Sequence, residues 1–259
     1  MNEDKKDRYK RIVTLLSQGG ELTVHDIAQV LDVSEMTVRR DLSEMEADRI
    51  VERTHGAARI FNPSSLVREN YVVSEQMQKS FQQKNLIGLK AASMVSAHET
   101  IFLDSGSTTP FIARYLDKDM PVTVLCYTFL NALELYNRKN TNLILSGGFF
   151  DKDSTVFHSS NAATFLKGIR ADKAFISAAG VDERLGLTTF FYFEADIKKL
   201  MMLSARQIVL VVDSTKFGKS SVSHFGELEQ VNVVITDAGV PDEARAMLRE
   251  KGVELIIAE

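Results

Sequence analysis

Four short loops rich in Ser, Thr, Gly and Asp follow apolar runs, and their residue types could bind an anionic ligand. The loops are "DSGSTT" at 104–109, "LSGG" at 145–148, "SAAGVD" at 177–182 and "DSTKFG" at 213–218. Backbone amides at the start of a helix carry partial positive charge that favours phosphate, and glycine lets the backbone approach a ligand closely. One such loop alone is more often a capped turn, but four together favour a phosphate pocket.

The first loop has the clearest phosphate-binding pattern. Asp104 ends an apolar run, Gly106 permits a tight turn, and Pro110 suits the first position of the helix that should follow. Hydroxyl groups flank the amides that would open this helix. The ligand-binding residues predicted in this loop are Asp104, Ser105, Gly106, Ser107, Thr108 and Thr109.

The other loops and the segment after the third one add glycines and charged side chains. The further candidates for ligand contact are Gly147, Gly148, Gly180, Asp182, Glu194, Lys198 and Lys216. Glu194 and Lys198 stand four residues apart, so an exposed ion pair on a helix is an equally good interpretation of these two.

These loops require a sheet to bring them together. From "TIFLD" at 100–104 to "VELIIAE" at 253–259, short apolar strands alternate with helical segments, which indicates an α/β fold on a mostly parallel sheet. Ligands of such sheets bind beyond the carboxyl ends of the strands, where the loops are expected. We therefore predict an α/β domain at 77–259 and a linker at 61–76, a segment with little periodicity.

The first sixty residues have the pattern of two helices joined by a tight turn. Apolar residues recur at helical spacing in "LTVHDIAQVL", where Thr23 is a suitable N-cap. After a break at Asp32 and Val33, Ser34 is the expected N-cap of a second helix. The alternating segment 49–60, with a glycine in its middle, predicts a hairpin or wing.

The second helix should have one apolar face and one cationic face. Val38, Leu42 and Met45 share a face at about 100° per residue, while Arg39 and Arg40 lie opposite. This is the pattern of a helix-turn-helix, whose second helix enters the major groove of DNA, where arginine can grip guanine edges or phosphates. The predicted DNA contacts are Ser34, Glu35, Met36, Thr37, Arg39, Arg40, Ser43, Arg53 and His55.

The charge of this N-terminal domain, 1–60, is unusual for a DNA-binding module. It contains ten Lys and Arg against twelve Asp and Glu, so it lacks a general basic footprint. The arginines are instead collected on the second helix and the wing. We therefore expect affinity for DNA to depend on several subunits that bind together.

Composition excludes several other classes of protein. Hydrophobic residues make up 44% of the chain and charged residues 25%, with a net charge of −4, which is typical of a globular protein. A single cysteine, Cys126, and a start without a signal peptide predict a cytoplasmic location. The five histidines have no metal-ligand spacing, and Walker and dinucleotide motifs are absent. We expect no metal, no cofactor, no catalytic residue and no membrane partner.

The chain resembles the DeoR family of bacterial transcription factors. "LTVHDIAQVLDVSEMTVRRDL" and "RTHGAA" look like that family's winged helix-turn-helix, and "FLDSGSTT", "LSGG", "SAAGVD", "EADIKKLM" and "DSTKFG" look like the successive motifs of its sensor domain. The resemblance implies a homo-oligomer, usually a repressor, that releases double-stranded operator DNA when it binds a phosphorylated sugar. The domain at 77–259 would then be a phosphosugar-sensing and oligomerisation domain. Whether the protein represses or activates is left open.

Two further expectations depend on this resemblance. Motifs such as "VSEMTVRRDL" and "LVVDSTKFGK" are most similar to deoxyribonucleoside-responsive members, which implies deoxyribose 5-phosphate as the effector of a sugar or deoxyribonucleoside catabolic operon. The sensor domain is also similar to ribose 5-phosphate isomerase. A phosphosugar isomerase with an accessory DNA-binding-like domain is therefore the alternative, although "LTTFFYFEA" replaces the glycine-rich run before the isomerase's catalytic glutamate.

Overall fold

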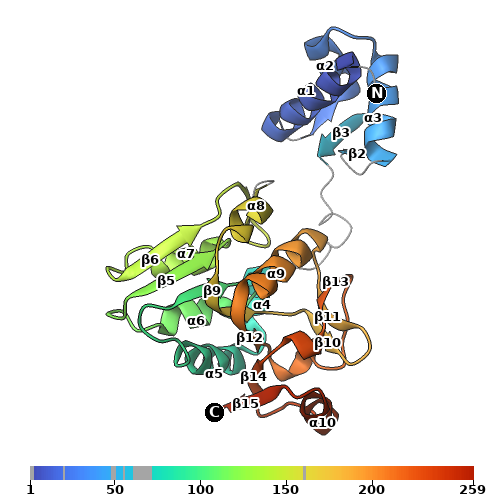
Figure 1. Cartoon of the computed structure of the whole chain (residues 1–259). Helices are drawn as coiled ribbons and strands as arrows, with labels where there is room; N and C mark the ends of the chain where they lie inside the picture. The colour runs from blue at the N-terminus through green and yellow to red at the C-terminus, as the bar shows by residue number, and fades with distance from the viewer. Residues whose placement is uncertain (1–2, 20, 48–50, 55, 61–71, 160–161) are drawn as a thin grey trace. The chain divides into compact units, whose positions relative to one another are not determined.

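The chain divides into two units, residues 1–69 and 70–259. The structure, a computed structural model, describes residues 3–19, 21–47, 51–54, 56–60, 72–159 and 162–259 (Figure 1). The segment predicted as a linker, 61–76, lies mostly outside these residues, but its end belongs to helix α4 (Val73–Gln78). Val73 is buried and its amide donates to the carbonyl of Asp153 at 3.0 Å, which ties α4 to the second unit.

The first unit is a winged helix-turn-helix. Its elements are α1 (Glu3–Gly19), β1 (Leu22–Thr23), α2 (Val24–Leu31), α3 (Glu35–Ala47), β2 (Val51–Arg53) and β3 (Ala57–Ile60). The strands form one antiparallel sheet in the order β1-β3-β2. The predicted hairpin is present, and β1 adds a strand that the sequence did not indicate.

Both predicted N-caps are confirmed. The Thr23 hydroxyl accepts the N–H of Asp26 at 3.1 Å, and the Asp26 carboxylate accepts the N–H of Thr23 at 3.3 Å, which forms a capping box. The Ser34 hydroxyl accepts the N–H of Thr37 at 3.2 Å. Between the two helices, Asp32 closes α2 in the left-handed conformation (φ 54°), which Asp tolerates better than most residues.

A buried ion pair joins α1 to α3. The Asp41 carboxylate on α3 is completely buried and accepts hydrogen bonds from Nε and Nη2 of Arg8 at 2.5 and 3.1 Å. A carboxylate without water is costly unless it is paired, and the planar guanidinium pairs with both of its oxygens. The inner face of α3 is therefore not wholly apolar, although Val38, Leu42 and Met45 are buried on it as predicted.

A seven-stranded sheet forms the centre of the second unit. Its strands are β4 (Thr100–Leu103), β5 (Val122–Cys126), β6 (Thr141–Leu145), β9 (Ala171–Ile176), β12 (Ala205–Val211), β14 (Val233–Asp237) and β15 (Glu254–Ala258). Their order is β15-β14-β12-β9-β4-β5-β6, and every neighbouring pair is parallel. The predicted parallel α/β fold is confirmed.

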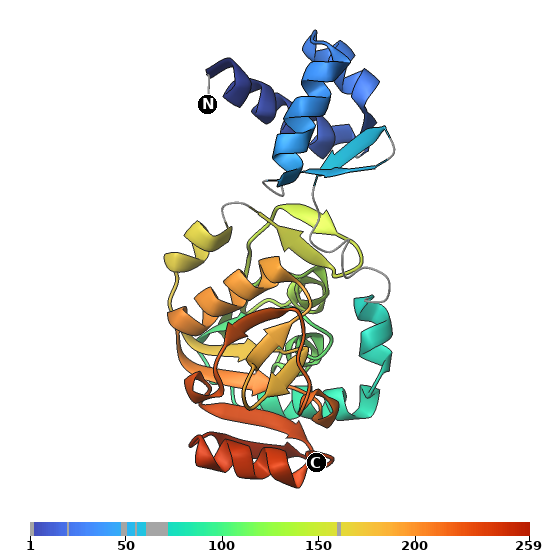
Figure 2. The ribbon, with the colours of Figure 1, turned by 90° about the vertical axis from the view of Figure 1, so that its right-hand side faces the viewer.

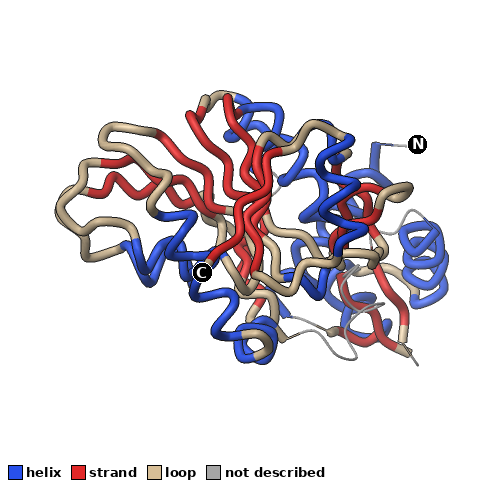
Figure 3. The backbone as a smooth tube through the Cα atoms, turned by 90° about the horizontal axis from the view of Figure 1, so that it is seen from below, coloured by secondary structure: helices blue, strands red, loops and turns tan. Residues whose placement is uncertain are grey.

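Helices cover both faces of this sheet (Figure 3). The helices are α5 (Phe81–Ala92), α6 (Thr109–Tyr115), α7 (Phe129–Leu135), α8 (Ala162–Lys167), α9 (Tyr192–Ser204) and α10 (Asp242–Glu250). Phe102 belongs to the buried cluster that includes residues of α8, α9 and α10, while its neighbours Ile101 and Leu103 belong to the cluster that includes residues of α5, α6 and α7. This alternation explains why the strands are continuous apolar runs, since both of their faces are buried.

Smaller elements extend the sheet edges and loops. They are the hairpin β7 (Phe149–Asp151) with β8 (Val156–His158), the antiparallel sheet of β10 (Gly180–Asp182), β11 (Gly186–Thr189) and β13 (Ser223–Gly226), and the 3-10 helices η2 (Ser214–Lys216) and η3 (Leu228–Gln230). Helix α10 lies beside strand β15 (Figure 2). No helix of the described segments is long and apolar enough to cross a membrane.

Candidate functional site

The strand order produces a crevice at the carboxyl ends of β4 and β9. The chain continues from β4 to β5 on one side, while β9, β12, β14 and β15 lie on the other side. Connections therefore leave the two neighbouring strands in opposite directions, which is where α/β sheets bind ligands. Asp104 follows β4 and Ser177 follows β9, and the Ser177 N–H donates to Oδ2 of Asp104 at 2.8 Å.

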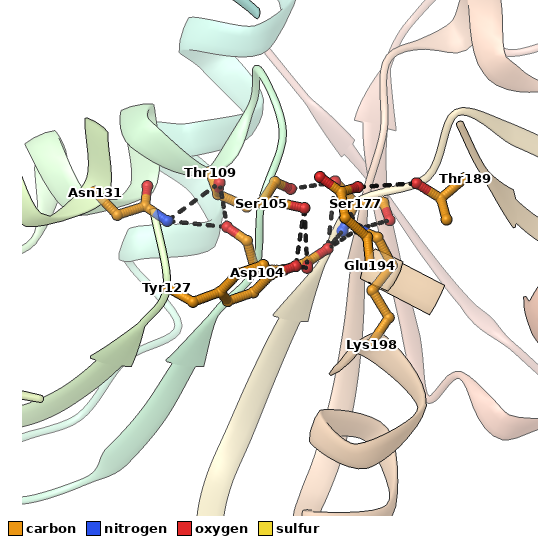
Figure 4. Close-up of polar contacts among 9 residues, drawn as sticks. All are labelled: Asp104, Ser105, Thr109, Tyr127, Asn131, Ser177, Thr189, Glu194 and Lys198. Carbon is orange, nitrogen blue, oxygen red and sulfur yellow. Dashed lines mark hydrogen bonds and ion pairs between the residues drawn. The ribbon is translucent and has the colours of Figure 1, made fainter. Parts of the chain in front are cut away.

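Asp104 organises the loop that follows β4 (Figure 4). Its carboxylate is completely buried, accepts the Tyr127 hydroxyl at 2.5 Å and forms an ion pair with the Lys198 ammonium. Burial, together with the nearby Asp104 charge, raises the pKa of Tyr127 well above its ordinary value, so this hydroxyl remains a donor. Both carboxylate oxygens have protein partners, which makes Asp104 a structural anchor of the pocket.

Two side chains hold the backbone of Asp104 in place. The Thr109 hydroxyl and the Asn131 amide donate to the Asp104 carbonyl at 2.8 and 2.9 Å. Asp104, Ser105 and Thr109 are buried and do not line the pocket above them. The sequence predicted these three residues as ligand contacts, whereas their polar side chains bond to other groups of the protein.

A pocket opens over this network, and several of the predicted ligand contacts line it. These residues are Gly106, Ser107, Thr108, Glu194, Lys198 and Lys216. Gly106 has φ 121°, and a Cβ atom there would lie 2.5 Å from the Ser177 hydroxyl, so both conformation and space require glycine. The pocket has a cavity volume of about 30 Å³, enough for a water molecule.

Glu194 and Lys198 are not the exposed ion pair that their spacing allowed. Both are buried in the pocket wall on α9, and Lys198 pairs with Asp104 instead. Thr189 donates its hydroxyl to Oε2 of Glu194 at 3.0 Å. Burial raises the pKa of Glu194 to about 7, against the effect of the nearby Lys198 charge. Near neutral pH this carboxyl can therefore either donate or accept a hydrogen bond.

Two more lysines lie at or near the pocket, Lys216 in its lining and Lys84 beside Asp213. Lys216 lines the pocket at the end of η2, and burial lowers its pKa. Lys84 on α5 is fully buried and donates to the carbonyls of Gln76 and Lys79 at 2.5 and 2.7 Å. Its ammonium is also 3.8 Å from the Asp213 carboxylate, and burial lowers its pKa to about 8. Sequence reasoning missed Lys84, because a lysine within a helical segment has no local signal of burial.

Besides Asp104, Ser105 and Thr109, four predicted contacts do not line the pocket: Gly147, Gly148, Gly180 and Asp182. A Cβ at Gly148 would lie 2.1 Å from the carbonyl of His158, and one at Gly180 would lie 2.3 Å from that of Lys219. These two glycines therefore permit close backbone packing. The Asp182 carboxylate accepts the N–H groups of Arg184 and Leu185 and closes the β10–β11 turn.

The sequence analysis missed three residues that contact the polar network of Asp104, Glu194 and Lys198. They are Tyr127, Ser177 and Thr189, of which Tyr127 and Ser177 directly follow strands.

The predicted DNA-reading face lies on α3 of the first unit. Met36 is 80% exposed, and Arg40 and Ser43 are also exposed, opposite the buried face of the helix. Glu35 accepts from Arg39 at 3.3 Å and is 3.1 Å from the His25 ring, so Arg39 is held along the helix surface. Ser34 and Thr37 form the helix cap.

Of the two DNA contacts predicted in the wing, the structure describes Arg53. Arg53 is exposed, its N–H donates to Glu46 at 3.2 Å, and its guanidinium lies 3.8 Å from the same carboxylate. His55 lies outside the described residues.

Neither unit has a group of three or more possible metal ligands among its described residues.

A winged helix-turn-helix joined to an α/β unit with a pocket at its sheet crevice defines a ligand-responsive transcription regulator. Two family models match the chain, the DeoR-like helix-turn-helix domain over residues 8–64 and the DeoR C terminal sensor domain over residues 79–238. The chain belongs to the DeoR family of DNA-binding transcriptional regulators, which carry a sugar-sensor domain. The predicted family is confirmed.

Curated relatives match nearly the whole chain. The deoxyribose operon repressor of Escherichia coli (strain K12) is 32% identical over 94% of this chain and 94% of its own length. The HTH-type transcriptional regulator GolR of Listeria innocua is 30% identical over 98% of both chains. These relatives are regulators and not enzymes, so the isomerase alternative is set aside.

Solved structures match more weakly. A ribose-5-phosphate isomerase in complex with phospho-erythronic acid matches with a TM-score of 0.39 and 16% identity, covering 52% of each chain. The full-length sorbitol operon regulator SorC from Klebsiella pneumoniae also has a TM-score of 0.39, with 11% identity over 96% of this chain and all of that one. At these scores neither match adds to the assignment.

Proposed function

We propose that this protein is a repressor of a sugar or deoxyribonucleoside catabolic operon, released from its operator when deoxyribose 5-phosphate or a similar phosphorylated sugar binds the pocket. The observation that carries the proposal is the composition of the pocket wall. It combines the hydroxyls of Ser107 and Thr108 with the buried Lys198 and the half-buried Lys216 at the crevice of the sheet.

The two ends of a sugar phosphate would meet different groups. Lys216 and the loop 106–108 offer a cation, hydroxyls and amides, which suit a phosphate. Glu194 and Thr189 also line the pocket and can hydrogen-bond to sugar hydroxyls, because the pKa of Glu194 near 7 permits either role.

Release from DNA requires a difference in affinity. The effector must bind the DNA-incompetent arrangement of the protein better than the competent one, and that difference alone shifts the equilibrium. On the DNA side, the exposed face of α3 with Arg40, Met36 and Ser43 would contact the major groove. Because the first unit has more acidic than basic residues, we propose that a homo-oligomer presents several such helices to the DNA in the bacterial cytoplasm.

The choice of deoxyribose 5-phosphate is supported by the name of the Escherichia coli relative, a deoxyribose operon repressor. GolR is similar to almost the same extent, so the effector has to be tested directly. Thermal unfolding of the full chain with deoxyribose 5-phosphate, ribose 5-phosphate, fructose 6-phosphate and glucosamine 6-phosphate is the first experiment. A ligand at a hundred times its Kd adds about 2.7 kcal/mol to native stability.

Two variants connect a thermal shift to the pocket. Thr108→Val and Lys216→Ala should abolish the shift and the release of operator DNA, while DNA binding without effector is unchanged. Lys219→Ala is the matched control, because Lys219 is exposed three residues further on. Stabilisation by deoxyribose 5-phosphate that both variants retain would refute the pocket. Stabilisation by another sugar phosphate alone would keep the mechanism and change the operon.

A further inference from the structure

A second cavity lies next to the sheet, away from the loop 106–108. We call it the α8–α9 cavity; it is lined by Tyr127, Ser146, His158, Ala162, Phe193 and Ile197 together with Phe157, Ser159 and aliphatic neighbours. Its volume is about 230 Å³, against about 30 Å³ for the sugar-phosphate pocket. An engineered protein cavity of about 150 Å³ is large enough to bind benzene.

The wall of the α8–α9 cavity is mostly aromatic and aliphatic, with two serines and one histidine. No Lys, Arg, Asp or Glu occurs among the described residues that line it. The imidazole of His158 packs edge-on against the ring of Phe193 with centroids 4.0 Å apart, and burial lowers the pKa of His158, so the ring is neutral near pH 7. A phosphate would therefore lose its hydration here without gaining a cation.

One polar group in this wall lacks a partner. The hydroxyl oxygen of Ser146 is buried, and it makes no hydrogen bond within the described part of the chain. A buried hydroxyl without a partner costs free energy, which a ligand with a matching donor or acceptor would recover. The loop that carries Ser146 was predicted to contact a ligand through Gly147 and Gly148; the structure places Ser146 of the same loop in this second cavity.

We propose that the α8–α9 cavity binds an uncharged aromatic or heteroaromatic ring that carries one hydrogen-bonding group. The ring would pack against Phe193 and Tyr127, and the polar substituent would bond to Ser146. This site is separate from the sugar-phosphate pocket, yet both use α9. Phe193 and Ile197 line the cavity, whereas Glu194 and Lys198, one position later in each case, line the pocket.

The test uses 4-fluorophenol and fluorobenzene as probes of the full-length protein, observed by 19F NMR. 4-Fluorophenol is uncharged near pH 7 and has one hydroxyl. Saturable binding of both probes is expected. Ser146→Ala should weaken 4-fluorophenol by roughly 2- to 10-fold, the value of about one net hydrogen bond, and leave fluorobenzene unchanged. Equal loss of both probes, or no loss of either, would show that Ser146 does not recognise the substituent.

A second variant fills the cavity. Ala162→Leu places a larger side chain in the wall and should reduce the affinity for both probes by about tenfold or more. Ala246→Leu is the matched control on the exposed face of α10 and should bind like the wild type. Saturating deoxyribose 5-phosphate should not compete with the probes. Absent or non-saturable binding, binding unaffected by Ala162→Leu, competition by the sugar phosphate, or a change of oligomeric state in Ala162→Leu would overturn the proposal.

Discussion

Replacing Asp104 by Asn tests whether the buried ion pair with Lys198 organises the sensor unit. The change keeps the shape of the side chain but removes its charge, so Lys198, 1% exposed, loses its counter-charge. Breaking a buried pair by removing one partner costs about 3–5 kcal/mol. For a unit of about 190 residues, each kcal/mol lowers Tm by roughly 2–4 °C, so we expect a decrease of roughly 6–20 °C.

Calorimetry of the full-length chain measures this effect, because two units can give two transitions. Asp196→Asn is the control, since Asp196 is exposed on the same helix as Lys198. The double variant Asp104→Asn with Lys198→Met should be more stable than the sum of the single changes predicts, because neither charge is then left alone. A decrease below about 2 °C for Asp104→Asn, or strict additivity in the double variant, would refute the proposed role.

Three further outcomes are expected. The pKa of Glu194 is about 7 in the folded protein against an ordinary 4.5, so the folded state binds this proton more tightly than the unfolded state. The free energy of unfolding should therefore fall by about 1.4 kcal/mol per pH unit as pH rises between these values. Denaturant titrations of Glu194→Gln should not show this fall. Arg8→Lys should destabilise the first unit by about 1–3 kcal/mol in thermal unfolding, because a lysine cannot bond both oxygens of Asp41; an unchanged Tm would contradict the bidentate pair. Arg40→Ala should weaken operator binding by about 1–3 kcal/mol in fluorescence anisotropy without changing Tm, and unchanged affinity would exclude Arg40 from the reading face.

Local hydrogen-bonding rules predicted the helix boundaries of the first unit well. Thr23 and Ser34 are N-caps because each hydroxyl accepts an amide three residues later, and that contact depends only on neighbours in the chain. The apolar face of α3 follows from helical periodicity in the same way. The buried Asp41 was not predictable, because its partner Arg8 comes from another helix.

In the pocket, too, local sequence signals were informative and contacts between separate elements were not. Residues directly after apolar strands could be assigned to one sheet edge, which found Thr108 and Lys216 without knowledge of the strand order. Glycines were less informative, because Gly148 permits close packing of two backbones and Gly106 shapes the pocket, yet both look alike in a loop sequence. The cavity beside Ser146 depends on side chains from separate elements and left no signal in the sequence.

The position of Gln76 in the pocket wall has a thermodynamic consequence. Gln76 belongs to α4, the first described helix after the segment that joins the two units, and its carbonyl accepts the buried ammonium of Lys84. A ligand that reaches Gln76 would therefore contact the helix from which the chain leads back to the DNA-binding unit. Coupling free energies are reciprocal. If a ligand favours one position of α4 by a given factor, then fixing α4 in that position must tighten the binding of that ligand by the same factor.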